Sequence, residues 1–142
     1  MIDTVLPVRE AYFLALQGLE VDFNGEILAV PVYDGAPPEA VRPYILLSTQ
    51  DTNGDVAIKD EFCYNTEESI LLDVVTAFPS GTGGKKLSDL ISNEILQRVF
   101  PRLTILDKPV YTVFVNSSTL EEEDGAHKIY RRLLRFRNNI FQ

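Results

Sequence analysis

The sequence predicts an α+β fold: a mainly antiparallel β-sheet with two helices packed on it, ending in a long C-terminal hairpin. Two segments carry apolar residues at helical spacing, Asn-Gly and Asp-Gly pairs mark tight turns, and the last part of the chain alternates as a strand does. The 142 residues suit one domain, residues 1–142, because a chain of this length buries about 68–70% of its unfolded surface.

The first half of the chain predicts one helix followed by strands. Apolar residues fall on one helical face up to Leu19, with Pro7 in the first turn and Gly18 at the end. Asn24-Gly25 separates two apolar runs and predicts a hairpin, because a type I′ turn needs positive φ at both central residues. The following segments predict a loop at 34–43, a strand at 44–49 and a turn at 51–55, whereas 56–69 fits either a strand or a loop.

The second half predicts a central strand, a helix and a hairpin. Residues 69–78 are almost continuously apolar, which indicates a central strand covered on both faces, or on one face plus a partner. The helix after the glycine-rich loop carries one apolar stripe, made of Leu87, Leu90, Ile91, Ile95 and Val99. Residues 110–118 alternate as a strand, Asp124-Gly125 predicts a second hairpin turn, and 128–141 predicts a long final strand.

The loop "PSGTGGKK" has the strand–loop–helix context of a phosphate-binding loop but lacks its pattern. Pro79 stands where the first glycine belongs, and Lys86 stands where a serine or threonine would bind magnesium. We therefore expect a sharp chain reversal and no nucleotide site. Lys85 and Lys86 precede a helix and add to the attraction of its N-terminus for anions, such as a carboxylate or a DNA phosphate; otherwise they are two solvated lysines.

No catalytic, cofactor-binding or metal-binding constellation is found. His127 is the only histidine, no G-x-S-x-G motif is present, and Cys63 between two aromatic residues is a small hydrophobe. "DTNGD" lacks the spacing of a calcium loop, and the run of Glu121, Glu122, Glu123 and Asp124 is typical of a solvated loop tip. We therefore expect no enzyme activity.

The amino-acid composition argues against several classes of protein. The net charge of −8 argues against a surface that binds nucleic acid throughout, since such binding depends on lysines and arginines. A single cysteine forms no intrachain disulfide and fits a reducing compartment. The N-terminal residues lack the pattern of a signal peptide, and no apolar run approaches the length of a membrane span. These observations indicate a soluble, cytosolic protein.

The final strand carries a basic stripe, defined here as Arg131, Arg135 and Arg137, which share one side by the period of two. Tyr130 and Phe136 lie on the opposite side and predict the core. Three interpretations of the stripe compete. It is a solvated edge strand, it faces DNA in a channel, or it pairs with the acids of a neighbouring subunit, for which the 121–124 run is the candidate.

Several segments resemble the phage tail terminator or tail-completion proteins, small subunits that cap the tail tube and join it to the head. The resemblance lies in "LALQGL", "VPVYDGAPPEAVRPYILLST", "ILLDVVTAFPSGTGGKKLSDLISNEILQRVF" and the final hairpin. In that family a valine-tyrosine-aspartate element precedes a proline-containing loop and a "PY" pair that opens the next strand. The corresponding residues here are Val32, Tyr33, Asp34, Pro37, Pro38, Pro43 and Tyr44.

The resemblance implies a structural virion protein that forms a homo-oligomeric ring, with a tail tube protein and neck or head-completion proteins as partners. Its location would be the tail or neck, with the host cytoplasm as the place of assembly. The alternatives are another neck or tail adaptor and a nucleic-acid-binding module that uses the basic stripe. We expect residues 34–43, 50–68 and 117–127 to contact neighbours, including Asp34, Pro37 and Pro38.

Overall fold

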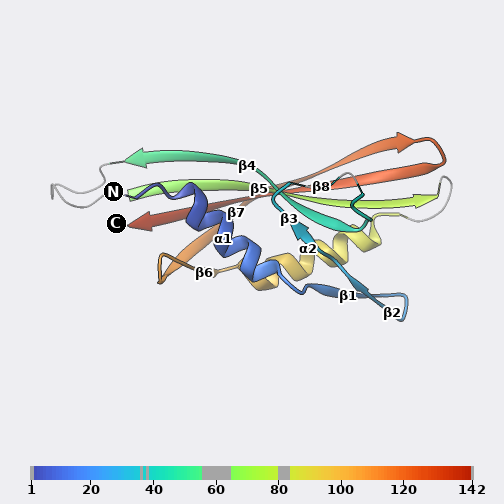
Figure 1. Ribbon diagram of the computed structural model, residues 1–142, viewed down its shortest axis with the longest axis horizontal. Helices are drawn as coiled ribbons and strands as arrows, with labels where there is room; N and C mark the ends of the chain where they lie inside the picture. The colour runs from blue at the N-terminus through green and yellow to red at the C-terminus, as the bar shows by residue number, and fades with distance from the viewer. Residues whose placement is uncertain (1, 36, 38, 56–64, 80–83, 142) are drawn as a thin grey trace.

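The computed structural model describes residues 2–35, 37, 39–55, 65–79 and 84–141. Within these residues, two helices and eight strands follow one another along an elongated molecule (Figure 1). In chain order the elements are α1 (Val5–Leu16), β1 (Glu20–Phe23), β2 (Glu26–Ala29), β3 (Val32–Tyr33), β4 (Tyr44–Asp55), β5 (Asn65–Pro79), α2 (Lys86–Val99), β6 (Arg102–Ile105), β7 (Lys108–Asp124) and β8 (His127–Phe141).

Six strands form one sheet in the order β3-β4-β5-β8-β7-β6, and β1 and β2 form a separate hairpin. All neighbours in the large sheet are antiparallel except β3 and β4. The predicted α+β fold with a mainly antiparallel sheet and a long C-terminal hairpin is therefore confirmed.

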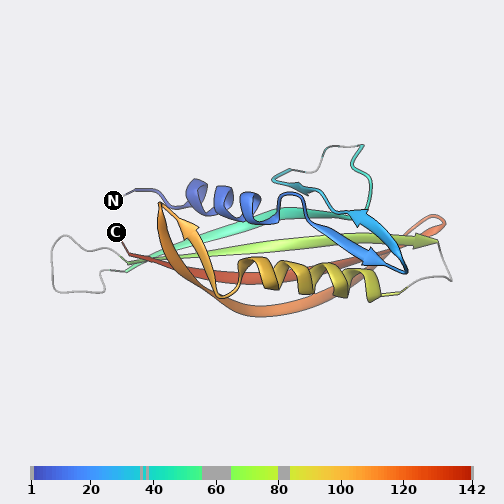
Figure 2. The same ribbon diagram turned by 90° about the horizontal axis from the view of Figure 1, so that it is seen from below.

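Both helices pack on the same face of the sheet, as Figures 1 and 2 show. The alternation along β5 and β8 explains this arrangement, because the even-numbered side chains point to the helices. Ile70, Leu72 and Val74 of β5 and Leu134 and Phe136 of β8 are all buried in one core with residues of both helices. We call the opposite side of the sheet the helix-free face.

The two helices form where their apolar periodicity predicts them. α1 buries Val8, Tyr12 and Leu16, and the chain turns away after it at Gly18, whose φ is +72°. α2 buries Leu87, Ile91, Ile95 and Val99, together with two serines that the stripe did not include. Ser88 and Ser92 are tolerated in the core because each hydroxyl donates to a nearby backbone carbonyl: that of Ser88 to Lys85, the residue before the helix, and that of Ser92 to Ser88.

The turn at Asn24-Gly25 is confirmed, whereas the predicted turn at 51–55 is wrong. Asn24 and Gly25 have φ of +54° and +83°, the positive values that a type I′ turn requires. Residues 51–55 instead continue β4, with Asn53 opposite Glu67 and Gly54 opposite Thr66 in the ladder with β5. Pairing with a long neighbouring strand outweighs the local turn preference of Asn-Gly.

The C-terminal hairpin is longer than predicted. β7 runs to Asp124, so the acidic run lies in a paired strand and not in a loop tip. The two-residue turn is Gly125-Ala126, one position later than Asp124-Gly125, with Gly125 at a φ of +58°. β6 was not predicted; it joins β7 through Leu106 and Asp107, which both adopt positive φ.

A buried carboxyl group fastens the start of α1 to the sheet. Glu68 is fully buried on the helix side of β5. It accepts hydrogen bonds from the Thr4 hydroxyl at 3.3 Å, from the Gln50 amide at 3.2 Å and from the Thr52 hydroxyl. Because burial disfavours the charged form, the pKa of Glu68 is raised above its ordinary value.

Candidate assembly surfaces

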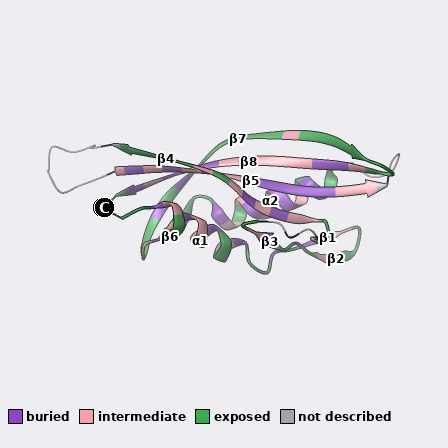
Figure 3. Cartoon of the chain, turned by 45° about the horizontal axis from the view of Figure 1, so that its top comes forward, coloured by how far each residue is buried: buried purple, intermediate pink, exposed green. Residues whose placement is uncertain are grey.

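The helix-free face carries the basic stripe in the middle of the sheet. β8 lies between β5 and β7, so the interpretation of the stripe as an edge strand is wrong. Figure 3 shows that β5 is largely buried and β7 largely exposed. The stripe side chains are half-buried, because residues of the neighbouring strands flank each of them.

Arg131 is the most strongly held member of the stripe. Its Nε and Nη2 both donate to Asp73 Oδ2, at 3.0 and 2.5 Å, and its Nη1 donates to Glu122 Oε1 at 3.1 Å. Asp73 is almost completely buried, so this bridge is less screened than a surface pair. The two carboxylates raise the pKa of Arg131. Asp73 Oδ1 has no hydrogen-bond partner among the described residues.

The other two stripe arginines also pair within the chain. Arg135 Nη1 lies 3.8 Å from Asp51 Oδ2 of β4, and Arg137 Nε lies 3.6 Å from Glu67 Oε2 of β5. Only Arg131 reaches the acidic run, which agrees with the differing distances of these groups from the turn. The stripe therefore needs no neighbouring subunit to neutralise it, because three arginines face the carboxylates of Asp51, Glu67, Asp73 and Glu122.

The acidic run connects the hairpin to the start of α2. Glu121 Oε1 lies 3.3 Å from Lys85 Nζ, and Glu121 Oε2 lies 3.4 Å from Lys128 Nζ. The hydrogen bonds from the two ammonium groups lower the pKa of Glu121, and the same contact raises the pKa of Lys128. No ion pair involving Glu123 or Asp124 is recorded in the part of the chain that the structure describes.

The two lysines that were candidates for an anion contact have partners of different kinds. Lys85 is the residue before α2 and meets the Glu121 carboxylate, so the anion next to this helix end comes from the chain itself. Lys86 Nζ donates to Asn24 Oδ1 at 3.0 Å and lies 5.9 Å from the centre of the Phe23 ring. These contacts tie α2 to the hairpin and to β1–β2. The glycine loop, 80–83, lies outside the described residues.

Two sheet edges lack a strand partner among the described residues. β3 pairs with β4 only at Ile45 and Leu46, which leaves β4 unpaired on that side from Leu47 to Asp55. β6 pairs with β7 up to Tyr111, and the Thr112 N–H still donates to the Pro101 carbonyl at 2.9 Å, which leaves one side of β7 unpaired from Val113 to Asp124. Both strands contain an irregularity in register, at Leu47/Gln50 and at Phe114/Asn116. Unpaired edges offer backbone groups to another chain.

A shallow groove separates α1 from the start of the proline loop. It measures about 580 Å³, and its lining includes Leu6, Phe13, Leu14 and the exposed Asp34. Pro37 lines a separate groove beside β2 and the loop, and Pro38 lies outside the described residues. The groove at α1 was missed by sequence reasoning. Its signal was present, because residues 6, 13 and 14 repeat at helical spacing on a second face of the helix.

The residues considered as catalytic or metal-binding candidates do not form a cluster among the described residues. His127 is exposed at the first position of β8, and Cys63 falls outside the described residues. In the described ranges no three histidine, cysteine, aspartate or glutamate side chains come together as a metal site would require. No described helix combines the length and the apolar character needed to cross a membrane.

These features define a single α+β domain whose distinctive surfaces, among the described residues, are a charged sheet face, two unpaired edges and an apolar groove. No protein-family model matches the sequence, and neither does any curated protein. Among solved structures, the chain is similar to a chain in the virion of a native gene transfer agent (GTA) particle. The two chains share the fold with a TM-score of 0.67, over 99% of this chain and 100% of the other, at 14% sequence identity.

Proposed function

We propose that this chain is a structural subunit of a tailed, phage-like particle, and that it forms the ring that terminates the tail tube and joins the tail to the head. The main support is the fold shared over both full chains with a component of a gene transfer agent virion. That similarity supports a place in a phage-like particle. The proposed position at the end of the tail rests instead on the resemblance of the turn residues to tail terminator proteins.

The unpaired edges support assembly into a ring. β4 is antiparallel to β5, β5 to β8, and β8 to β7, so β4 and β7 run in opposite directions. They lie on opposite long sides of the molecule (Figure 2). A rotation about an axis along the strands therefore brings the β7 edge of one copy antiparallel to the β4 edge of the next. Repeated contacts of this head-to-tail kind close into a ring when the rotation allows it.

The charge distribution argues against the alternative of a nucleic-acid-binding module. The chain carries a net charge of −8, and the basic stripe is matched by carboxylates at every arginine. A surface in which cations are already paired releases few counterions from DNA and binds it weakly. Such a surface suits a channel through which DNA passes, and any contact with DNA in the lumen would be transient.

The partners under this proposal are the tail tube protein on one side of the ring and neck or head-completion proteins on the other. The exposed parts of the acidic run are the first candidates for these contacts. Replacing Glu122 and Glu123 with lysine should leave the subunit folded and impair assembly, because both side chains lie on the exposed strand β7. Circular dichroism would verify folding, and electron microscopy would score assembly.

Negative-stain electron microscopy of the purified protein, alone and mixed with tail tubes of its own particle, tests the proposal. We expect rings, and we expect one ring at one end of each tube, which then stops growing. A protein that binds isolated heads and ignores tubes would instead be a neck or head-completion protein. A protein that binds neither would refute a role at this joint.

A further inference from the structure

The outer face of α1 is apolar, although the helix already buries an apolar face in the core. We define the α1 ridge as Leu6, Glu10 and Leu14, which follow one another at intervals of four residues on the side opposite the buried one. Leu14 is 69% exposed and Leu6 56%. In α2, all of whose residues are described, no large hydrophobic side chain is exposed. A helix that is apolar on nearly all sides is typical of a covered element, so the α1 ridge indicates that another molecule packs on it.

A groove lies on each side of the α1 ridge. One is the groove of about 580 Å³ between α1 and the start of the proline loop, to which Phe13 adds further apolar surface. The other measures about 600 Å³ and lies between α1 and β6, with Leu103 and Leu106 on its far side. Glu10 and Leu14 line both grooves. A ridge between two grooves is a shape onto which a second element packs by placing side chains on both sides of it.

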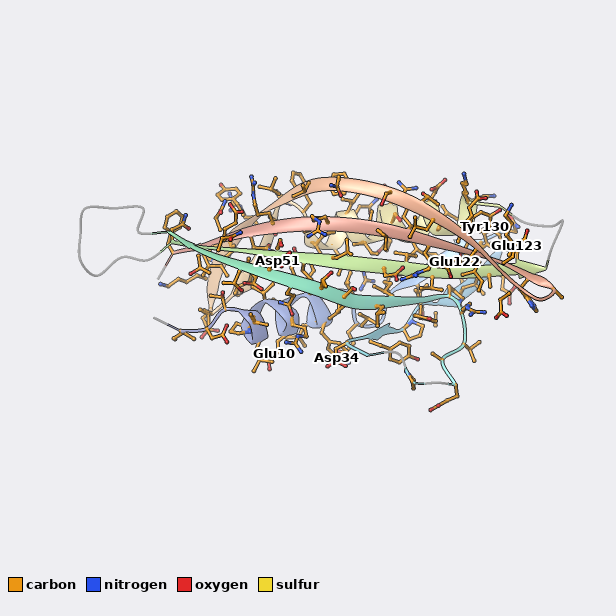
Figure 4. All side chains as sticks on the ribbon, turned by 90° about the horizontal axis from the view of Figure 1, so that it is seen from above. Glu10, Asp34, Asp51, Glu122, Glu123 and Tyr130 are labelled. Carbon is orange, nitrogen blue, oxygen red and sulfur yellow. The ribbon has the colours of Figure 1, made fainter. Side chains whose placement is uncertain are left out.

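The two grooves carry more acids than cations. Glu10 stands between them, Asp34 lines the first and Asp107 lines the second, and all three side chains are exposed. Glu10 and Asp34 lie along the same margin of the molecule (Figure 4). Arg9 is the one cation among the described residues that line either groove, since Lys108, next to Asp107 in the sequence, lines a separate groove. Even with Arg9 counted in full, the surface keeps an excess of two negative charges.

We propose that the α1 ridge and its two grooves bind a segment of a partner protein that carries apolar side chains flanked by lysine or arginine. The apolar side chains enter the grooves beside Leu6 and Leu14, and the cations meet the carboxylates around them. A second copy of α1 is a poor occupant, because two ridges in contact would bring two Glu10 carboxylates together. The proposal deepens the function proposed above and rests on it for the source of the segment, a tail tube, neck or head-completion protein.

Substitutions on the ridge of the full-length protein test the binding. Leu14→Ser and Glu10→Lys should each weaken binding to purified tail tubes or heads by roughly tenfold or more, measured by co-sedimentation over a concentration series. Both variants should keep the wild-type circular dichroism spectrum, because the two side chains are exposed. Matched controls are Ile27→Ser and Glu26→Lys on the β1–β2 hairpin, where Ile27 is 61% exposed; both should bind as wild type does. Folded Leu14→Ser and Glu10→Lys proteins that bind as tightly as wild type would overturn the proposal.

Photo-cross-linking identifies the molecule that covers the ridge. Cys63→Ser removes the natural thiol, after which Leu14→Cys is labelled with a benzophenone maleimide and irradiated in the presence of purified tail tubes or heads. Ile27→Cys, labelled in the same way, is the control. We expect position 14, and not position 27, to link to a tube, neck or head protein, at a peptide that mass spectrometry shows to carry lysine or arginine beside apolar residues. A link to a second copy of this chain, or to a peptide without cations, would overturn the proposal.

The outcomes separate this binding surface from the function proposed above. Links from position 14 to a neck or head protein, by a chain that does not bind tail tubes, would support the surface and refute the terminator function. Rings that cap tail tubes with no link from position 14 to another protein would refute the surface and leave the terminator function standing. A protein that binds neither tubes nor heads would refute both.

Discussion

Replacing Ile91 with aspartate should unfold the subunit. Ile91 lies in the middle of α2, is fully buried, and packs in the core between the helix and the sheet. Truncation of such a side chain to alanine costs about 2–5 kcal/mol, and an uncompensated buried charge adds several kcal/mol more. Domains of this kind have a free energy of unfolding of about 5–15 kcal/mol. We therefore expect Ile91→Ala to fold with reduced stability and Ile91→Asp not to fold.

Urea denaturation followed by circular dichroism at one fixed protein concentration measures both effects. The concentration is fixed because association stabilises the folded state. Asn93→Asp is the matched control: it introduces the same charge two residues further along α2 at an exposed position, and should change the free energy of unfolding by no more than about 0.5 kcal/mol. A soluble Ile91→Asp protein with the wild-type denaturation midpoint would show that α2 does not pack as described.

Three further predictions concern charged groups. Burial raises the pKa of Glu68 in the folded state, so the stabilising effect of its proton is present at acidic pH and is lost as pH rises through that pKa. Because glutamine stays neutral, Glu68→Gln should be more stable than wild type at neutral pH, and the difference should become smaller in acid. Urea denaturation midpoints measured across this pH range would show it. Neither wild type nor Lys85→Ala should bind ATP or GTP in calorimetry, and saturable wild-type binding that the substitution abolishes would contradict this. Arg135→Glu should lower the free energy of unfolding by at most about 1 kcal/mol, and adding Asp51→Arg should restore part of that loss. Both effects should disappear in high salt. If the losses of the two single variants simply add in the double variant, the two side chains do not interact.

Elements whose pattern is local were predictable from the sequence. The Asn24-Gly25 turn, both amphipathic helices and the final strand each carry their signal within a few neighbouring residues. The structure departs from prediction where distant segments decide. Residues 51–55 look like a turn in isolation, but the ladder with β5 extends them as a strand. β3 has only two residues, and its parallel pairing joins it to β4 on the other side of the proline loop, so no local sequence pattern predicts it.

The same division applies to the candidate surfaces. That Arg131, Arg135 and Arg137 share one side of a strand follows from the period of two, and this was predicted. Their partners were not, because Asp51 and Asp73 come from strands whose register only the folded sheet defines. That Leu14 is more exposed than Leu16, two positions away on the same helix, follows from the helical period, which places Leu14 off the face that carries Val8, Tyr12 and Leu16.

The difference in length between sheet and helices has a mechanical consequence. β5 and β8 have 15 residues each and extend about 50 Å, whereas α1 and α2, with 12 and 14 residues, cover only about 18–21 Å each. The ends of the long strands therefore extend beyond the helices on both sides (Figure 1). An extended strand has almost no slack along its axis. Two proteins bound at opposite ends of these strands would therefore be held at a nearly constant separation.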